Sequence, residues 1–270
     1  MFTRVALGRA RVVREVRAAA PLMAALRAPV TAQGPWLTAV LNTGVARGSR
    51  ARPAAVVVED HAQGRPDGVA FLTVRRSLLR TTVTVLGDDV APIPPGRPAA
   101  RLLARDDETA ARLAAGVHQL LLSLRGPWNL RLAGLPLGDP TQRELAALLP
   151  GAAVGNERSA RLVDELDDVA AAVVHSRDPR ALESELPGLL AREPDARARA
   201  FLRSTARLHA AIGRVELAVV PGDDGPRAAL LTLVEGADRW PWWGFSDVGG
   251  LRTELGGPLV RLTASSRGRP

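Results

Sequence analysis

Apolar and polar positions alternate with a helical period in some parts of the chain and a strand period in others. Residues 9–28 show the spacing of an amphipathic helix, which Pro21 interrupts and Pro29 ends. A second short helix is predicted to begin at Pro35 and to end at Gly44. The pattern thus predicts that the chain starts with helices.

Three short runs rich in branched residues follow, at 55–59, 69–75 and 81–86, and turn-forming residues border each of them. Their close spacing favours an antiparallel meander of strands. Proline and glycine then recur through residues 87–100, which we expect to form an exposed loop.

A long apolar stripe at 110–124 predicts the next helix, and an aspartate precedes it as a cap. A strand is expected at 128–132, followed by a short helix that Asp139 caps. Residues 159–166 fit either a strand or the start of a helix, and the sequence leaves both open.

A helical pattern runs from 178 to 212 in two pieces that divide near Pro194. Two strands, 214–220 and 227–234, are joined by the turn PGDDG and predict a hairpin, and a last strand is expected at 258–263. Hairpins mixed with helices favour an α+β (mixed α/β) fold with a mostly antiparallel sheet over a doubly wound parallel sheet. No internal repeat with a period of about 20–50 residues is present.

Three residue types are missing from the 270-residue chain, and each absence excludes a class of chemistry. Cysteine and tyrosine are absent, and all 36 basic residues are arginine because the chain is also lysine-free. A cysteine-free chain has no disulfide, thiol nucleophile or thiolate zinc site. Without lysine it has no Schiff-base chemistry and no P-loop lysine. The abundance of Ala, Arg, Gly and Pro is typical of a GC-rich, actinobacterial-like genome, which replaces lysine by arginine.

The net charge of +8 is concentrated in the first fifth of the chain. Residues 1–53 hold nine arginines and one acid, Glu15, whereas residues 54–270 hold equal numbers of basic and acidic residues. This basic segment could attract nucleic acid or another anionic surface. A solvated basic helix explains the same pattern, and no aromatic residue lies among the arginines to stack on bases.

Apolar runs are too short for a transmembrane segment, which needs about 20 residues. Arginines also occupy the N-terminal positions where a secretory signal would have its apolar core, so we expect a cytoplasmic location. Nucleotide-binding glycine motifs and a serine-hydrolase elbow are absent. The four histidines are widely separated and the acidic run at 164–168 has no glycine turn, so we predict no metal site.

The most unusual stretch combines clustered aromatic residues with glycines and charged side chains. Its members are Trp240, Trp242, Trp243, Phe245, Asp247, Gly249, Gly250 and Arg252. A stacking surface, a flexible backbone and charge together favour a ligand-binding loop. The same aromatic residues could instead fill one end of a core made of small aliphatic side chains, and both interpretations remain open.

Six segments occur in a characteristic order: PWLTAVL (35–41), AVVVE (55–59), GVAFLTVRR (68–76), TVTVLGDDVAP (82–92), the helix at 107–124, and WNLRLAGLPLGDPTQRELAALL (128–149). In this order they resemble the first half of GNAT-superfamily acyltransferases of the FemAB-like, polysaccharide-associated branch. The resemblance implies a GNAT-like, mixed and mostly antiparallel sheet flanked by helices and splayed to admit an acyl thioester. It also implies transfer of an acyl or aminoacyl group to an amine.

Two departures from that pattern keep a second interpretation open. The nearest match to the acyl-CoA loop, residues 131–136, ends in Pro136, which lacks an amide donor. The second half also lacks the tyrosine-rich closing motif of the branch. A non-catalytic binding or assembly protein would use the Trp-rich loop 240–247 and the basic segment 1–53, and could be a homo-oligomer.

The resemblance divides the chain into the basic helical segment 1–53, a first GNAT-like half at 54–166, and residues 167–270 with a helical pair and a divergent β half. If the protein is an N-acyltransferase, Glu216 or Glu235 would be the general base.

The donor would be a small molecule such as acyl-CoA, or an aminoacyl donor. Arg252 and the amides of Gly249 and Gly250 would hold its anionic part, and the aromatic residues from Trp240 to Phe245, with Asp247, would contact the acceptor. No covalently bound cofactor is expected.

Overall fold

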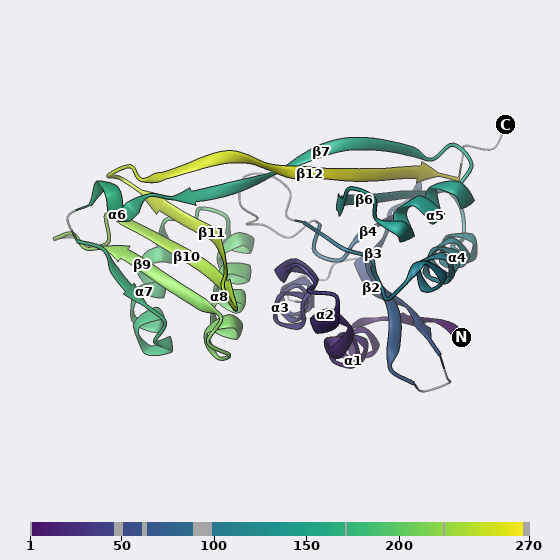
Figure 1. The fold of residues 1–270 in the computed structure, drawn as a ribbon, viewed down its shortest axis with the longest axis horizontal. Helices are drawn as coiled ribbons and strands as arrows, with labels where there is room; N and C mark the ends of the chain where they lie inside the picture. Colours follow the sequence, from purple (N-terminus) through teal and green to yellow (C-terminus); the bar gives the residue numbers. More distant parts are fainter. Residues whose placement is uncertain are drawn as a thin grey trace. The chain divides into compact units, whose positions relative to one another are not determined.

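The computed structural model describes residues 2–45, 51–60, 64–88, 99–170, 172–223 and 225–266. They form a mixed α/β fold with a large, mostly antiparallel sheet flanked by helices, which confirms the predicted fold class (Figure 1). The chain divides into two compact units. Of the described residues, the first unit holds those up to 88, 99–158 and 258–266, and the second holds 159–257.

The elements of the first unit are, in chain order, β1 (Phe2–Leu7), α1 (Arg9–Ala18), α2 (Ala20–Ala25), a 3₁₀ turn (Val30–Ala32), α3 (Gly34–Val45), β2 (Ala51–Glu59), β3 (Pro66–Arg76), β4 (Thr81–Val85), β5 (Leu103–Ala104), α4 (Asp107–Ser123), β6 (Trp128–Pro136) and α5 (Pro140–Leu148). The strands β7 (Ala153–Asp164) and β12 (Leu251–Ser265) have residues in both units. The second unit adds α6 (Leu166–Val169), β8 (Val174–Ser176), α7 (Pro179–Ala191), α8 (Ala196–Ala210), β9 (Val215–Val220), β10 (Ala228–Glu235) and β11 (Asp238–Ser246).

The large sheet has the strand order β1-β2-β3-β4-β6-β12-β7, with β5 paired to β3. Helices cover both of its faces in the first unit. Thr3 of β1 faces Gly116 of α4, whereas its neighbour Arg4 binds Glu15 of α1. Because successive strand residues point to opposite faces, α4 and α1 lie on opposite sides of the sheet. The apolar stripe of α4, including Leu113, packs into the main core.

The second unit repeats the topology with which the first unit begins. Its four-stranded sheet has the order β8-β9-β10-β11, and every neighbouring pair is antiparallel. The helices α7 and α8 follow its first strand, just as α1 to α3 follow β1. Each unit therefore contains a strand, a group of helices and three antiparallel strands, in the same chain order and the same sheet order.

The structure confirms most of the predicted elements, adds strands at 153–158 and 174–176, extends the last strand so that it begins at Leu251, and corrects two further points. The helix pair predicted at 178–212, the hairpin of β9 and β10, and the helix at 110–124 are all present. Strand β1 was not predicted. Residues 240–246 belong to strand β11 and are not a loop, since their backbone pairs with β10 and aromatic residues favour strands.

Residues 159–166, which the sequence left open, continue β7 as far as Asp164. Most of the expected loop at 87–100 lies outside the described residues. Within the described ranges, no helix combines the length and the apolar character needed to cross a bilayer.

Candidate functional site

Glu216, one of the two predicted bases, lies near the start of β9 and is buried, with 8% exposure. Arg239 and Arg177 donate to its carboxylate from 3.0 Å and 2.9 Å. The hydrogen bonds from Arg239 are the main reason why the pKa of Glu216 falls to about 2. A carboxylate with so low a pKa is a weak base, so this geometry suits an ion-pair partner better than a proton acceptor.

Glu235, the other predicted base, ends β10 and is half-buried. One of its carboxylate oxygens lies 3.5 Å from a guanidinium nitrogen of Arg214. Thr232 of β10 is the residue paired with Glu216, and Glu235 comes three positions later. An odd number of positions along a strand reverses the face, so the two glutamates lie on opposite faces of this sheet.

Arg252 is exposed on β12, and its guanidinium group already binds two carboxylates. Its Nη2 atom lies 2.6 Å from Glu165, and Nη1 contacts Glu254. Gly249 and Gly250 both have left-handed backbones, with φ of 84° and 80°.

The carbonyl of Gly250 accepts from the amide of Glu165 at 2.7 Å, and a Cβ at this position would lie 3.0 Å from the Glu165 carbonyl oxygen. These glycines therefore close a tight turn against the start of α6.

The clustered aromatic residues divide between core and surface. Trp242 is fully buried and packs edge-on against Phe201, with 6.2 Å between the ring centroids, which supports the core interpretation for this residue. Trp240, Trp243 and Phe245 are half-buried, and the last two form a second edge-on pair.

A charged residue completes the surface part of this group. The guanidinium of Arg192 lies 4.7 Å above the Phe245 ring and 2.8 Å from Asp247.

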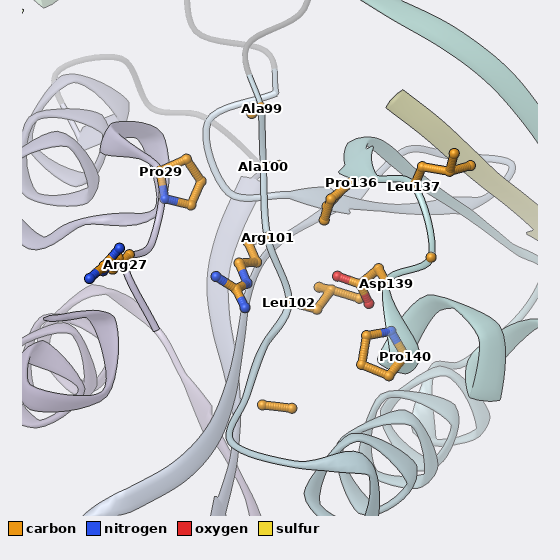
Figure 2. Close-up of a pocket in the computed structure, with 12 residues that line it drawn as sticks. Arg27, Pro29, Ala99, Ala100, Arg101, Leu102, Pro136, Leu137, Asp139 and Pro140 are labelled. Carbon is orange, nitrogen blue, oxygen red and sulfur yellow. The ribbon is translucent and has the colours of Figure 1, made fainter. Parts of the chain in front are cut away.

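A pocket that the sequence did not predict lies in the first unit and has a volume of about 410 Å³ (Figure 2). Three separate segments line it: the connection after α2, the segment that leads into β5, and the turn between β6 and α5. The lining residues are Arg27, Pro29, Ala99, Ala100, Arg101, Leu102, Ala104, Pro136, Leu137, Gly138, Asp139 and Pro140.

Arg27 has an unusual backbone at the edge of this pocket. Its φ of 45° is the only positive value among the described residues other than glycine. Arg27 directly follows α2 and its C-cap, and the next amide, that of Ala28, donates to the Met23 carbonyl. Glycine is normally favoured at the position that Arg27 occupies in this kind of helix end. Among the described residues, no hydrogen-bond or ion-pair partner is found for its guanidinium group. Backbone strain of this kind tends to persist at functional sites.

Arg101 and Asp139 bring a second cation and a carboxyl group to the same pocket. Arg101 donates to the carbonyl of Leu26, and Figure 2 shows it between Arg27 and Asp139 in that view. Asp139 is buried and caps α5 by accepting the amide of Gln142 at 2.8 Å. Burial raises the pKa of Asp139. A buried carboxyl with a raised pKa in a pocket is a candidate proton acceptor.

The two parallel strands beside the pocket, β4 and β6, pair over only part of β6. β4 ends at Val85 and its pairing with β6 ends at Thr84 and Arg131, whereas β6 continues to Pro136. The segment 99–104 lies beside this last part of β6 and reaches β3, because the Ala100 amide donates to Gly134 of β6 and β5 pairs with β3. The chain's own backbone thus forms one wall of the pocket.

Neither residues 131–136, the nearest match to an acyl-CoA loop, nor the start of α4 is suited to hold a pyrophosphate group. Residues 131–136 lie inside strand β6 and not at a helix N-terminus. The helix that follows the opening, α4, begins with Asp106 as its cap and with Asp107 and Glu108 in its first turn. Those carboxylates would repel a pyrophosphate group.

No protein-family model and no curated protein matches the sequence. Among solved structures, the chain is similar to FemX at 13% identity and a TM-score of 0.44, covering 86% of this chain and 58% of FemX. It is similar to a tandem GNAT protein from the clavulanic acid biosynthesis pathway at 14% identity and a TM-score of 0.39, covering 100% of this chain and 99% of that one.

A third similar structure is the C-terminal domain of a protein assigned as a lysylphosphatidylglycerol synthetase from Agrobacterium fabrum. It shows 11% identity and a TM-score of 0.44, covering 87% of this chain and 70% of that one. The chain therefore spans 58% of the length of the FemX structure. With TM-scores below 0.5, we base no functional assignment on these similarities.

Proposed function

We propose that the protein transfers an acyl or aminoacyl group to an amine, and that the reacting groups bind in the pocket of Arg27, Arg101 and Asp139. One observation carries the proposal: two guanidinium groups and one buried carboxyl group line a single cavity of about 410 Å³. The resemblance of residues 35–149 to the first half of GNAT-type acyltransferases supports the class of reaction. The end of β4 beside β6, which continues without it to the pocket residue Pro136, supports its location.

Each of the three residues has a defined role in this proposal. Arg27 and Arg101 bind the anionic part of the donor, either acyl-CoA or an aminoacyl donor, because guanidinium groups match carboxylate and phosphate geometry. Asp139 accepts the proton of the amine while the nitrogen attacks the donor carbonyl. The bond from that carbonyl to the leaving group then breaks, and Asp139 returns the proton to the leaving group.

The candidate site residues that were predicted in the second unit have no role in the proposed reaction. Glu216 and Arg252 are already engaged in ion pairs within the second unit, and Trp242 is part of its core. Glu235 lies on the opposite sheet face from Glu216 and is not required by the proposed reaction.

The test is the substitution Asp139→Asn, because asparagine caps a helix about as well as aspartate but cannot accept the proton. We expect unchanged thermal stability and lost amine acylation with acyl-CoA or aminoacyl-tRNA as donor. Asp178→Asn, at the cap of α7, is the matched control and should keep full activity. If neither donor raises the melting temperature of the wild-type protein, the proposed function is wrong.

A second candidate function is a binding protein that presents strand β11. The observation that favours it is the half-buried pair of Trp243 and Phe245, held at the surface with Arg192 above the ring. Such half-exposed aromatic residues beside an arginine are typical of interface anchors. Trp243→Ala should then release a co-purifying partner, whereas Asp139→Asn should not. Retention of the partner by Trp243→Ala would exclude this candidate.

A further inference from the structure

The hairpin of β3 and β4 ends in two leucines that are almost completely exposed. Leu78 is 94% exposed and Leu79 is 79% exposed. They are the central residues of a tight turn, in which the amide and the hydroxyl of Ser77 both donate to the Arg80 carbonyl at 2.8 Å. The turn is therefore well formed, and its tip points two large apolar side chains into solvent.

The backbone of this turn does not need leucine. Neither Leu78 nor Leu79 has a positive φ, and turns of this kind normally carry glycine, asparagine or aspartate. Folding also gains nothing from apolar side chains that remain exposed. The contacts within the described chain therefore do not explain why these two positions are leucine.

Arginines gather at the same end of the sheet. Arg75 and Arg76 end β3, Arg80 precedes β4, and all three are exposed. Arg52 is at the start of β2, where the neighbouring Ala51 pairs with Arg75.

The start of β6 adds a further arginine to this group. The Thr81 amide donates to the Pro127 carbonyl at 2.8 Å, which brings the turn containing exposed Arg125 beside the tip. Five exposed arginines from four connected segments thus lie at the same end of the sheet as the two leucines.

The acidic residues of the same elements lie at the other end. Glu59 ends β2 and Asp67 is at the start of β3, where Glu59 pairs with Pro66. The acids of the first turn of α4 are at that end too, since Arg105 just before them bonds to Asp67. At that end Arg4 and Arg105 pair with Glu59 and Asp67. At the other end, β2 and β3 carry arginines and no acidic residue, so the leucine tip is part of a basic end.

We propose that this basic end docks on an anionic lipid surface, with Leu78 and Leu79 inserted among the headgroups and the surrounding arginines bound to lipid phosphates. Charge complementarity supports a lipid surface as the occupant. A small protruding apolar tip within a ring of arginines can enter the interface while every guanidinium stays at phosphate level. Each arginine near such a surface is expected to raise the affinity about fivefold.

The experiment is co-sedimentation of the full chain with phosphatidylcholine vesicles, with and without phosphatidylglycerol, at low salt. We expect binding only to the vesicles that contain phosphatidylglycerol. The double variant Leu78→Asp/Leu79→Asp should reduce the affinity at least about tenfold, since it removes the inserted apolar surface and adds two negative charges at the tip. Leu255→Asp, at a leucine that is 75% exposed in the second unit, is the control for a charge added elsewhere and should bind like the wild type.

The role of the arginines is tested separately by two variants that change the net charge equally. Arg76→Glu should weaken binding at least about fivefold, whereas Arg203→Glu, at an exposed arginine of α8, should change it little. The fluorescence of a Leu79→Trp variant should shift to the blue with anionic vesicles.

Three results would overturn the proposal. The first is no binding to anionic vesicles, and the second is equal loss of binding in the tip variant and in Leu255→Asp. The third is a wild-type dimer that the tip variant converts to a monomer without any vesicle binding, which would assign the tip to a second copy of the chain.

Discussion

Arg239 binds the carboxylate of Glu216 through both terminal nitrogens of its guanidinium group. Because Arg177 binds the same carboxylate, Glu216 connects strands β8, β9 and β11. We predict that Glu216→Ala lowers the free energy of unfolding by about 1–3 kcal/mol, because it leaves two guanidinium groups without their acceptor. Urea denaturation monitored by tryptophan fluorescence measures this change.

Glu183→Ala is the control for that substitution. Glu183 also binds an arginine with two contacts, but both side chains are exposed, at 45% and 53%. Exposed pairs contribute little to stability, so the control should unfold close to the wild-type midpoint. Equal effects of the two substitutions would contradict the structural role assigned to Glu216.

His175 predicts a pH dependence of stability. Its Nε2 atom lies 3.0 Å from Asp167, and its Nδ1 atom lies 3.5 Å from Glu216. The hydrogen bond to Asp167 raises the pKa of His175 above the ordinary 6.5, so the folded protein holds this proton more tightly than the unfolded chain. This contribution is complete below pH 6.5 and is lost as the pH rises through the folded-state pKa.

His209 is buried, which lowers its pKa, so it also contributes to the pH dependence of stability. Because wild type and His175→Asn both contain His209, the difference between their urea midpoints isolates the effect of His175. The gap between their urea midpoints should be largest near about pH 5 and should shrink toward about pH 9. A gap that is constant or grows with pH would show that the ion pairs of His175 do not contribute to stability.

Arg27→Gly separates stability from ligand binding. Glycine adopts the left-handed backbone of residue 27 without strain, so we expect an increase of about 0.5–1 kcal/mol in the free energy of unfolding. The same substitution removes a guanidinium from the pocket and should weaken the stabilisation by donor. Differential scanning fluorimetry with and without acyl-CoA or aminoacyl-tRNA measures both effects, and unchanged donor stabilisation would remove Arg27 from the proposed site.

Substitution of two helical glycines by alanine should change the free energy of unfolding in opposite directions. A Cβ on Gly116 of α4 would lie 2.5 Å from Thr3 and 2.7 Å from Val56, so Gly116→Ala should cost about 1–3 kcal/mol. A Cβ on Gly188 of α7 would meet only Pro226, at 3.9 Å, so Gly188→Ala should stabilise by about 0.5–1 kcal/mol. Thermal unfolding of both variants checks the close approach of α4 to the sheet.

Local patterns were sufficient to predict elements whose signals are contained in a short stretch of sequence. The apolar stripe at 110–124 and the turn PGDDG are of this kind. Strand β1 is different, because Arg4 interrupts its apolar residues. Its pairing partner β2 is also far away in the sequence, and the carboxylate that binds Arg4 belongs to Glu59, which is 55 positions later. The topological repeat of the two units is likewise invisible to a search for short periods.

The pocket could not be predicted for a related reason. Arg27, Arg101 and Asp139 come from three distant segments, and no spacing between them marks a motif. Asp139 was correctly predicted as a helix cap, but its burial depends on the tertiary fold. The aromatic cluster gave a strong local signal, yet the strand alternation and bulge of β11 send Trp242 to the core and leave Trp243 near the surface.

Strand β12 has a consequence for the order in which the protein can fold during synthesis. Its residues Leu259 to Ser265 pair with β6 of the first unit, although the whole second unit lies between them in the sequence. On the ribosome, the whole second unit is therefore synthesised while β6 still lacks this neighbour. Until Leu259 to Ser265 are available, β6 is an open strand edge that other chains can pair with, so slow translation of residues 159–257 should favour aggregation of the nascent chain.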